Sequence, residues 1–195
     1  CDLYLSENGY AKSRSRAREL IEAGHVSING RIVRKPSEFV DELAEIQVEI
    51  SCEMPFVSRG GLKLDHALNT FCLSVEGLCA LDIGASTGGF TDCLLKRGAA
   101  RVIAVDSGEN QLDPSLREDT RVICVEKYNA RYMKAEDFDL IPDMAVIDVS
   151  FISQTLILPC VASLLRDGGI YVGLIKPQFE AGRAALDKHG IVKGV

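Results

Sequence analysis

The chain has 195 residues, of which 47% are hydrophobic, 26% charged and 6% aromatic. This composition is typical of a globular protein and excludes collagen-like, low-complexity and disordered chains. The formal net charge is −6, so binding to a nucleic acid requires a local basic patch, because the charge of the whole chain opposes it.

Residues 1–50 are predicted to form a small α+β unit with helices first and strands after them. Ser13 is a suitable N-cap, an apolar stripe at helical spacing follows it, and Gly24 ends the helix. The stripe consists of Ala17, Leu20 and Ile21. Asn29 and Gly30 then separate two short alternating segments, which is the strongest short signal for a β-hairpin.

A basic patch lies in this unit. Residues 12–35 contain seven cations and two anions, whereas all charged residues of the segment 36–50 are anions. Arg14 and Arg18 are four residues apart and share a helical face. Clustered arginines can make bidentate contacts with phosphates, which supply affinity without sequence information. On charge alone, a solvated helix face is an equally good interpretation.

The whole segment AKSRSRARELIEAGHVSINGRIVRKPSEFV resembles the S4 RNA-binding domain. This resemblance implies that the unit, residues 1–51, binds structured RNA through phosphate contacts. The residues predicted to contact RNA are Lys12, Arg14, Arg16, Arg18, Arg34 and Arg59. Residues 52–58 are predicted to be a linker, since Pro55 favours an extended residue before it and no periodicity is present.

The second domain, residues 59–195, is predicted to be an α/β domain with a parallel sheet. A helical stretch contains Leu64, Ala67, Leu68 and Phe71 at helical spacing. Five continuous apolar runs follow, at residues 78–81, 102–105, 122–125, 144–147 and 170–175. Such runs indicate strands that are buried on both faces. The residues that follow the runs are Asp82, Asp106, Glu126, Asp148 and Lys176. Because ligands bind at the carboxyl ends of parallel strands, these residues are candidates for a site.

The loop after the first strand indicates a nucleotide-like cofactor. Glycines between a strand and a helix let the backbone approach such a ligand closely. The spacing here is D-x-G-x-x-x-G-G, beginning at Asp82, and differs from G-x-G-x-x-G. An acidic residue at this place would repel a pyrophosphate but tolerate the cationic amino group and sulfonium of S-adenosylmethionine. Asp106 suits a ribose diol and fits NAD equally well. A methyltransferase is therefore favoured over an NAD-dependent oxidoreductase, which stays the alternative.

Five motifs together resemble the TlyA family: PFVSRGGLKL, LDIGASTGGFTDCLL, NARY, IDVSFIS and KPQFEAGR. Members of this family combine an S4 domain with an FtsJ-like (RrmJ-like) methyltransferase domain and are also labelled haemolysin A. The resemblance implies a Rossmann-like fold, S-adenosylmethionine as cofactor, and 2′-O-methylation of cytidines in ribosomal RNA. It also implies a cytoplasmic protein that acts on ribosomal RNA or ribosomal subunits, as a monomer or weak homo-oligomer.

The resemblance further implies which residues form the site. Lys63, Asp148 and Lys176 match three members of the family's Lys-Asp-Lys-Glu catalytic set. Glu180 is a possible substitute for the fourth, which belongs to a strand region outside this chain. The family fold has seven strands and the sequence provides five, so we expect a largely formed cofactor site without full activity. The implied cofactor-binding residues are Asp82, Gly84, Ala85, Ser86, Gly88, Gly89, Phe90, Asp106, Asn129 and Ala130.

The expected chemistry assigns a role to each catalytic residue. Lys176 is predicted to abstract or accommodate the proton of a ribose 2′-hydroxyl. Burial and the like charge of Lys63 would favour the neutral amine that a base requires. Asp148 would orient Lys176 and offset its charge.

Two other functions stay open, and several classes are not expected. A ribosome-binding protein with a silent methyltransferase domain would bind RNA without methyl transfer. A pore-forming haemolysin would need to enter a membrane, yet the chain contains no apolar run of the ~20 residues that a helical span requires. A secretory signal is not expected from residues 1–8. The seven cysteines include no Cys-x-x-Cys pair and the three histidines are scattered, so no metal site is expected.

Overall fold

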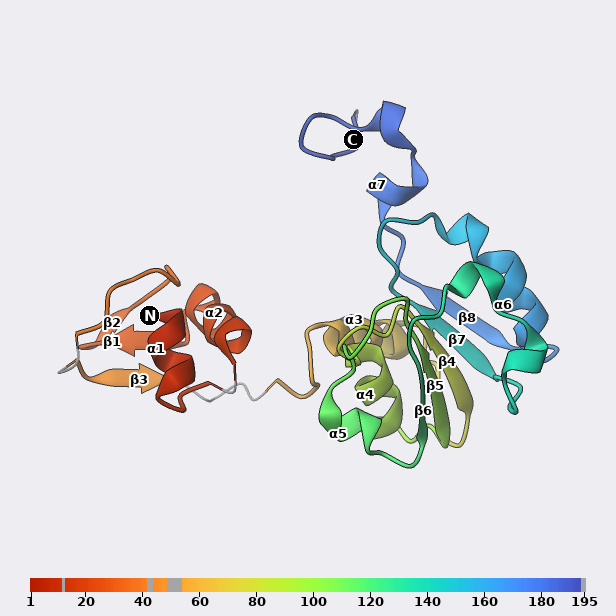
Figure 1. The fold of residues 1–195 in the computed structure, drawn as a ribbon, viewed down its shortest axis with the longest axis horizontal. Helices are drawn as coiled ribbons and strands as arrows, with labels where there is room; N and C mark the ends of the chain where they lie inside the picture. The colour runs from red at the N-terminus through yellow and green to blue at the C-terminus, as the bar shows by residue number, and fades with distance from the viewer. Residues whose placement is uncertain (12, 42–43, 49–53, 194–195) are drawn as a thin grey trace. The chain divides into compact units, whose positions relative to one another are not determined.

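A computed structural model describes residues 1–11, 13–41, 44–48 and 54–193. The chain forms two compact units, Cys1–Glu53 and Met54–Val195, which are drawn in Figure 1. The predicted linker overlaps the second unit, because Phe56 is 8% exposed and belongs to its hydrophobic core. Within the described ranges, no helix has both the length and the apolar character needed to cross a membrane.

The first unit contains two helices and a three-stranded antiparallel sheet. Its elements are α1 (Asp2–Glu7), α2 (Arg14–Ala23), β1 (Val26–Ile28), β2 (Arg31–Ile32) and β3 (Ile46–Val48), with strand order β2-β1-β3. The side chain of Ser13 accepts a hydrogen bond from the Arg16 amide, and Gly24 ends α2 in a left-handed conformation. Asn29 and Gly30, with φ of 50° and 76°, connect the hairpin. The predicted cap, helix end and hairpin are confirmed.

The second unit is an α/β domain with a parallel five-stranded sheet. Its strands are β4 (Cys79–Ile83), β5 (Arg101–Val105), β6 (Val122–Val125), β7 (Met144–Ile147) and β8 (Ile170–Gly173), in the order β6-β5-β4-β7-β8. Its helices are α3 (Gly60–Thr70), α4 (Gly89–Lys96), α5 (Pro114–Arg117), α6 (Leu158–Leu164) and α7 (Pro177–Glu180). Short 3₁₀ turns are η1 (Ala130–Tyr132), η2 (Ala135–Asp137), η3 (Gln154–Leu156) and η4 (Arg183–Ala185). The predicted parallel sheet is confirmed.

Helices cover both faces of this sheet (Figure 1). Successive strand residues point to opposite faces, and β4 shows this clearly. Ala80 packs in the core with α3 and α4, whereas Leu81 and Ile83 pack in the core with α6. Phe71, predicted to extend the apolar stripe of α3, lies one residue past the helix and is 64% exposed.

The order of the strands reverses beside β4. The chain runs from β4 outward through β5 to β6, then crosses to β7 on the other side of β4 and continues to β8. The carboxyl ends of β4 and β7 therefore form the topological switch point, which is where open α/β sheets bind their ligands.

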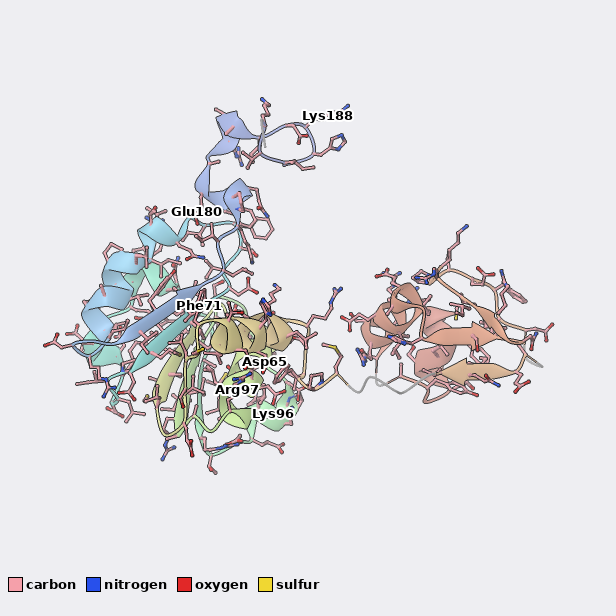
Figure 2. All side chains as sticks on the ribbon, turned by 180° about the vertical axis from the view of Figure 1, so that it is seen from behind. Asp65, Phe71, Lys96, Arg97, Glu180 and Lys188 are labelled. Carbon is pink, nitrogen blue, oxygen red and sulfur yellow. The ribbon has the colours of Figure 1, made fainter. Side chains whose placement is uncertain are left out.

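Helix α3 is held closely against α4. Figure 2 labels Asp65 on α3 and Arg97 at the end of α4, and the Arg97 guanidinium donates to the carboxylate of Asp65 at 2.8 Å and to the side-chain oxygen of Asn69 at 2.7 Å. At the other end, a Cβ on Gly89 would lie 2.9 Å from the backbone nitrogen of Gly61. This contact requires a glycine at position 89.

We expect Gly89→Ala to lower the free energy of unfolding by about 1–3 kcal/mol, because the added methyl group forces two helix backbones apart. Gly60→Ala is the matched control, since its Cβ would meet no atom closer than 3.4 Å. Urea unfolding of both variants checks this prediction. Equal stabilities would show that the two helices can separate without loss of packing.

Candidate active site

Three predicted catalytic residues meet at the switch point. Lys63 comes from the first turns of α3, Asp148 follows β7, and Lys176 precedes α7. The Nζ atom of Lys63 lies 2.9 Å from Oδ2 of Asp148, and the Nζ atom of Lys176 lies 2.6 Å from Oδ1. One carboxylate thus lies between two lysines that are far apart in the sequence.

The Asp148 carboxylate is ionised in this arrangement. Burial alone would raise its pKa, but the hydrogen bonds from Lys176 and Lys63 outweigh burial and bring the pKa below its ordinary value. The Asp148 side chain is 17% exposed, Lys176 is 20% exposed and Lys63 is 49% exposed. Lys176 also donates to the hydroxyl of Ser150 at 2.8 Å. Two acceptors, the Asp148 carboxylate and the Ser150 hydroxyl, therefore hold the Lys176 head group.

The glycine turn lies directly beside this cluster. Gly84 has a φ of 80°, and a Cβ on it would lie 3.1 Å from the backbone oxygen of Asp148. Asp106, at the end of β5, ties the turn down, since Oδ2 accepts from the amide of Ser86 at 2.8 Å and Oδ1 from the amide of Gly108 at 2.7 Å. The turn, Asp106 and the lysine–aspartate cluster thus share one edge of the sheet.

Asp82 is not located where the sequence predicted it. It lies inside β4 and is fully buried, because the strand extends to Ile83. Thr91 on α4 donates to Oδ2 at 2.7 Å, and Oδ1 has no hydrogen-bond partner among the described residues. Burial, with smaller contributions from Asp148 and Asp106, raises the pKa of Asp82 to about 7.

Several residues predicted to bind the cofactor also have structural roles. Ala85 and Phe90 are buried in the core with α3 and α4, so the ring of Phe90 is not available to a ligand. Gly88 has a φ of 92°, and a Cβ there would lie 2.3 Å from Leu116. Gly89 permits the approach of α3. In this turn, Gly84 and Ser86 are the predicted residues that are not buried.

The loop that follows β6 borders the same edge. The amide of Tyr128 donates to the backbone oxygen of Asp106, and the side chain of Asn129 caps η1, which begins at Ala130. Glu126 accepts hydrogen bonds from three backbone amides of the loop after β5 and pairs with Arg117 at 2.7 Å. Hydrogen bonding to Arg117, which is the largest cause, lowers the pKa of Glu126 to about 2. Glu126 therefore stabilises the conformation of the loop that follows β5.

Glu180 does not join the lysine–aspartate cluster through any contact among the described residues. Its carboxylate accepts from the amide of Gln154 at 2.9 Å and from the hydroxyl of Ser153. Hydrogen bonds from Gln154 and Ser153 lower its pKa. Glu180, labelled in Figure 2, thus anchors α7 to the segment that follows Asp148.

An aromatic pair next to the cluster was missed by the sequence analysis. Phe151 is 92% exposed, has a φ of 65°, and its ring centroid lies 5.2 Å from that of Phe179. A left-handed conformation is unfavourable for a residue with a side chain of this size, and such strain is concentrated at functional sites. The motif IDVSFIS contains Phe151, but no sequence pattern shows that its ring is exposed.

The predicted RNA-binding arginines of the first unit are mostly paired with carboxylates. Arg14 and Arg18 both contact Asp2, and Arg16 pairs with Glu19 at 3.2 Å. Arg34 is exposed, with its guanidinium close to Gly24. Lys12 lies outside the described residues. Arg59 belongs to the second unit, where it is exposed at the start of α3. No group of three potential metal ligands occurs in the described part of the chain.

Comparisons with known proteins agree with this architecture. A family model for the FtsJ-like methyltransferase matches residues 56–194, and one for the S4 domain matches residues 2–46. Hemolysin A of Brachyspira hyodysenteriae is 47% identical over 193 residues, which are 98% of this chain and 80% of that protein. The 16S/23S rRNA (cytidine-2'-O)-methyltransferase TlyA of Mycobacterium tuberculosis is 44% identical over 191 residues, 98% of this chain and 71% of TlyA.

A solved structure from Streptococcus thermophilus is similar over both units. It is 48% identical with a TM-score of 0.75, covering 98% of this chain and 70% of the other. Together, the fold and the site define an α/β methyltransferase of the Rossmann-like class with an S4 domain before it. The chain belongs to the FtsJ-like methyltransferase family, and the resemblance to TlyA is confirmed.

Proposed function

We propose that this protein uses S-adenosylmethionine to methylate the 2′-hydroxyl of cytidines in ribosomal RNA. The observation that carries the proposal is the shared Asp148 carboxylate between Lys63 and Lys176, beside the glycine turn at the switch point. The name of TlyA and the S4 domain support ribosomal RNA as the substrate. That substrate would make the cytoplasm the place of action.

The residues at this edge fit S-adenosylmethionine. Asp82 is fully buried and its Oδ1 atom has no hydrogen-bond partner within the described ranges, so a donor with positive charge would complete it. In the turn after β4, Gly84 is partly exposed and Ser86 is exposed, so both can meet a ligand. Asp106 offers carboxylate oxygens for a ribose diol once its contacts with the amides of Ser86 and Gly108 yield. When bound, S-adenosylmethionine supplies an electrophilic methyl group on a sulfonium.

The lysine–aspartate cluster would act on the 2′-oxygen. Lys176 has one N–H that is not used by Asp148 or Ser150, and we assign it to the attacking oxygen, whose negative charge it would stabilise while the 2′-hydroxyl proton passes to solvent water. Asp148 fixes both lysine head groups, so the charge is oriented before the substrate arrives. Lys63, the more exposed of the two lysines, is assigned to the adjacent phosphate or ribose.

The exposed ring of Phe151 is a platform for the target base. Base stacking on an aromatic side chain contributes ~1–3 kcal/mol, so we expect Phe151→Ala to lower methyl transfer about tenfold while cofactor affinity stays unchanged. Phe71→Ala, which removes a phenylalanine that is 64% exposed at the far end of α3, is the control and should keep full activity. Equal rates for both variants would contradict the platform.

The proposed function is tested with tritiated S-adenosylmethionine and unmethylated ribosomal subunits. The expected result is label in ribosomal RNA with the wild-type chain and none above background with the Asp148→Ala variant. Calorimetry measures the binding of S-adenosylmethionine and of NAD in parallel. Binding of NAD alone would favour the oxidoreductase, and RNA binding without any transfer would favour the silent domain.

A further inference from the structure

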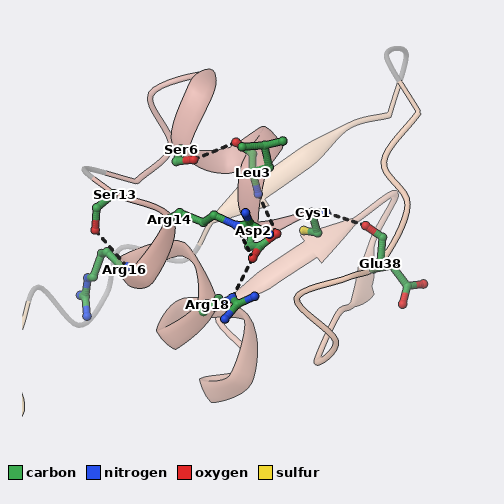
Figure 3. A network of polar contacts seen from close by, with 9 residues as sticks. All are labelled: Cys1, Asp2, Leu3, Ser6, Ser13, Arg14, Arg16, Arg18 and Glu38. Carbon is green, nitrogen blue, oxygen red and sulfur yellow. Dashed lines mark hydrogen bonds and ion pairs between the residues drawn. The ribbon is translucent and has the colours of Figure 1, made fainter.

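Asp2 in the first unit is a buried carboxylate next to arginines that are predicted to bind RNA. It is 4% exposed, at the start of α1. Its Oδ2 atom accepts from Nε of Arg14 at 2.9 Å and from Nε of Arg18 at 2.8 Å, and Oδ1 accepts from the amide of Leu3 at 2.8 Å (Figure 3). One buried carboxylate thus holds two arginines of the neighbouring helix.

The contact leaves the outer ends of both arginines available. Each guanidinium binds Asp2 through Nε, and the Nη groups of Arg14 and Arg18 have no hydrogen-bond partner among the described residues. Their side chains are 57% and 55% exposed. Since both Nε atoms contact the same oxygen, the two guanidinium groups are neighbours, and their free N–H groups can meet one phosphate or two consecutive ones.

We propose that Asp2 is a positioning residue for RNA binding, which holds Arg14 and Arg18 as a preformed pair of phosphate clamps. This inference rests on the proposed RNA substrate. Arginine side chains are flexible, and fixing them before binding lowers the entropy that binding would otherwise lose. Hydrogen bonds from Arg14 and Arg18 keep the pKa of Asp2 far below its usual range, so the carboxylate stays charged at neutral pH.

A simple effect of charge and a positioning role of Asp2 predict opposite effects of Asp2→Asn on the affinity for RNA. Removing an anion from a surface that binds a polyanion should tighten binding by simple electrostatics. If Asp2 positions the arginines, the same substitution should weaken binding about tenfold. Glu7→Gln on the same helix is the matched control, because it removes the same charge from an exposed side chain and should bind RNA as well as the wild type or slightly better.

Filter binding of the full chain to in vitro transcribed 23S ribosomal RNA tests the proposal. A second background, Arg14→Lys with Arg18→Lys, keeps the charge but removes the Nε contacts. The expected result is that Asp2→Asn weakens binding in the wild type and has no weakening effect in the lysine background. A loss of the same size in both backgrounds would indicate a general structural defect and overturn the proposal.

Thermal unfolding followed by circular dichroism accompanies the titrations, which are made at a temperature where every variant is folded. Unchanged or tighter binding by Asp2→Asn overturns the positioning role, while wild-type binding to RNA still supports the proposed function. Failure of the wild-type chain to bind the transcript would instead count against the proposed substrate.

Discussion

Replacement of Lys176 by alanine is expected to lower the rate of methyl transfer 100- to 1,000-fold without weakening cofactor binding. Removing one preorganised donor from a developing oxyanion typically has an effect of this size. Lys176 contacts Asp148 and Ser150 and is not part of the glycine turn, so S-adenosylmethionine should bind the variant normally. Single-turnover transfer to ribosomal subunits and calorimetry with the cofactor measure the two effects separately.

Lys176→Arg distinguishes two roles for this residue. A base must lose its proton, which arginine does not do in proteins, whereas a positive charge that stabilises the oxygen is kept. We expect Lys176→Arg to retain more transfer than Lys176→Ala. Lys134→Ala is the control, because Lys134 is exposed and pairs with Glu136 at 3.4 Å. Full activity of Lys176→Ala would remove Lys176 from the mechanism.

Replacement of Asp82 by asparagine should separate cofactor binding from folding. The variant keeps the shape of the side chain and its hydrogen bond with Thr91 but loses the negative charge. Loss of one partner from a buried charge pair typically costs 2–5 kcal/mol in affinity. We therefore expect the dissociation constant for S-adenosylmethionine to rise at least about 30-fold, measured by calorimetry.

The contribution of Asp82 to the stability of the wild-type chain should fall as pH rises from about 4 to about 7. Burial raises the pKa of Asp82 from 3.8 to about 7. Between these values the unfolded chain has lost a proton that the folded chain retains, so rising pH favours unfolding, and the effect is complete above the folded pKa. The full shift corresponds to at most about 4 kcal/mol.

Asp82→Asn should lack this dependence and be the more stable protein at pH 8. Urea unfolding at pH 5 and pH 8 measures both free energies. Thr91→Val is a useful companion, since it removes the hydrogen bond to Asp82 and keeps the carboxyl. A wild-type stability that rises between pH 5 and pH 8 while the asparagine variant stays flat would contradict the assigned environment.

Much of the fold follows from local signals in the sequence. Ser13, Gly24 and the Asn29-Gly30 pair act through contacts within a few residues, and each is found as predicted. The five apolar runs became strands because continuous apolar segments can be buried on both faces only in a covered sheet. The sequence analysis ended β4 before Asp82, because a charged residue is typical of a strand end. In the structure the strand continues through Asp82.

The site could be predicted only in part. Asp148 and Lys176 were candidates because each follows an apolar run, and the resemblance added Lys63 and the catalytic role of all three. Their meeting depends on the strand order, which no local pattern specifies. Phe90 was assigned to the cofactor through the resemblance, and the loop sequence does not show that its side chain is buried in the core. The exposure of Phe151 likewise depends on how the segment after Asp148 turns, with a positive φ that the sequence does not indicate.

The lysine–aspartate cluster is proposed to direct a methyl group to a ribose oxygen, and the position of the methyl group in the product tests this directly. Tritium-labelled ribosomal RNA from the transfer reaction is hydrolysed in alkali, which cleaves RNA only where the 2′-hydroxyl is free. We expect the label in alkali-stable dinucleotides that contain cytidine. Label in mononucleotides would mean methylation of a base and would contradict 2′-O-methylation by this protein.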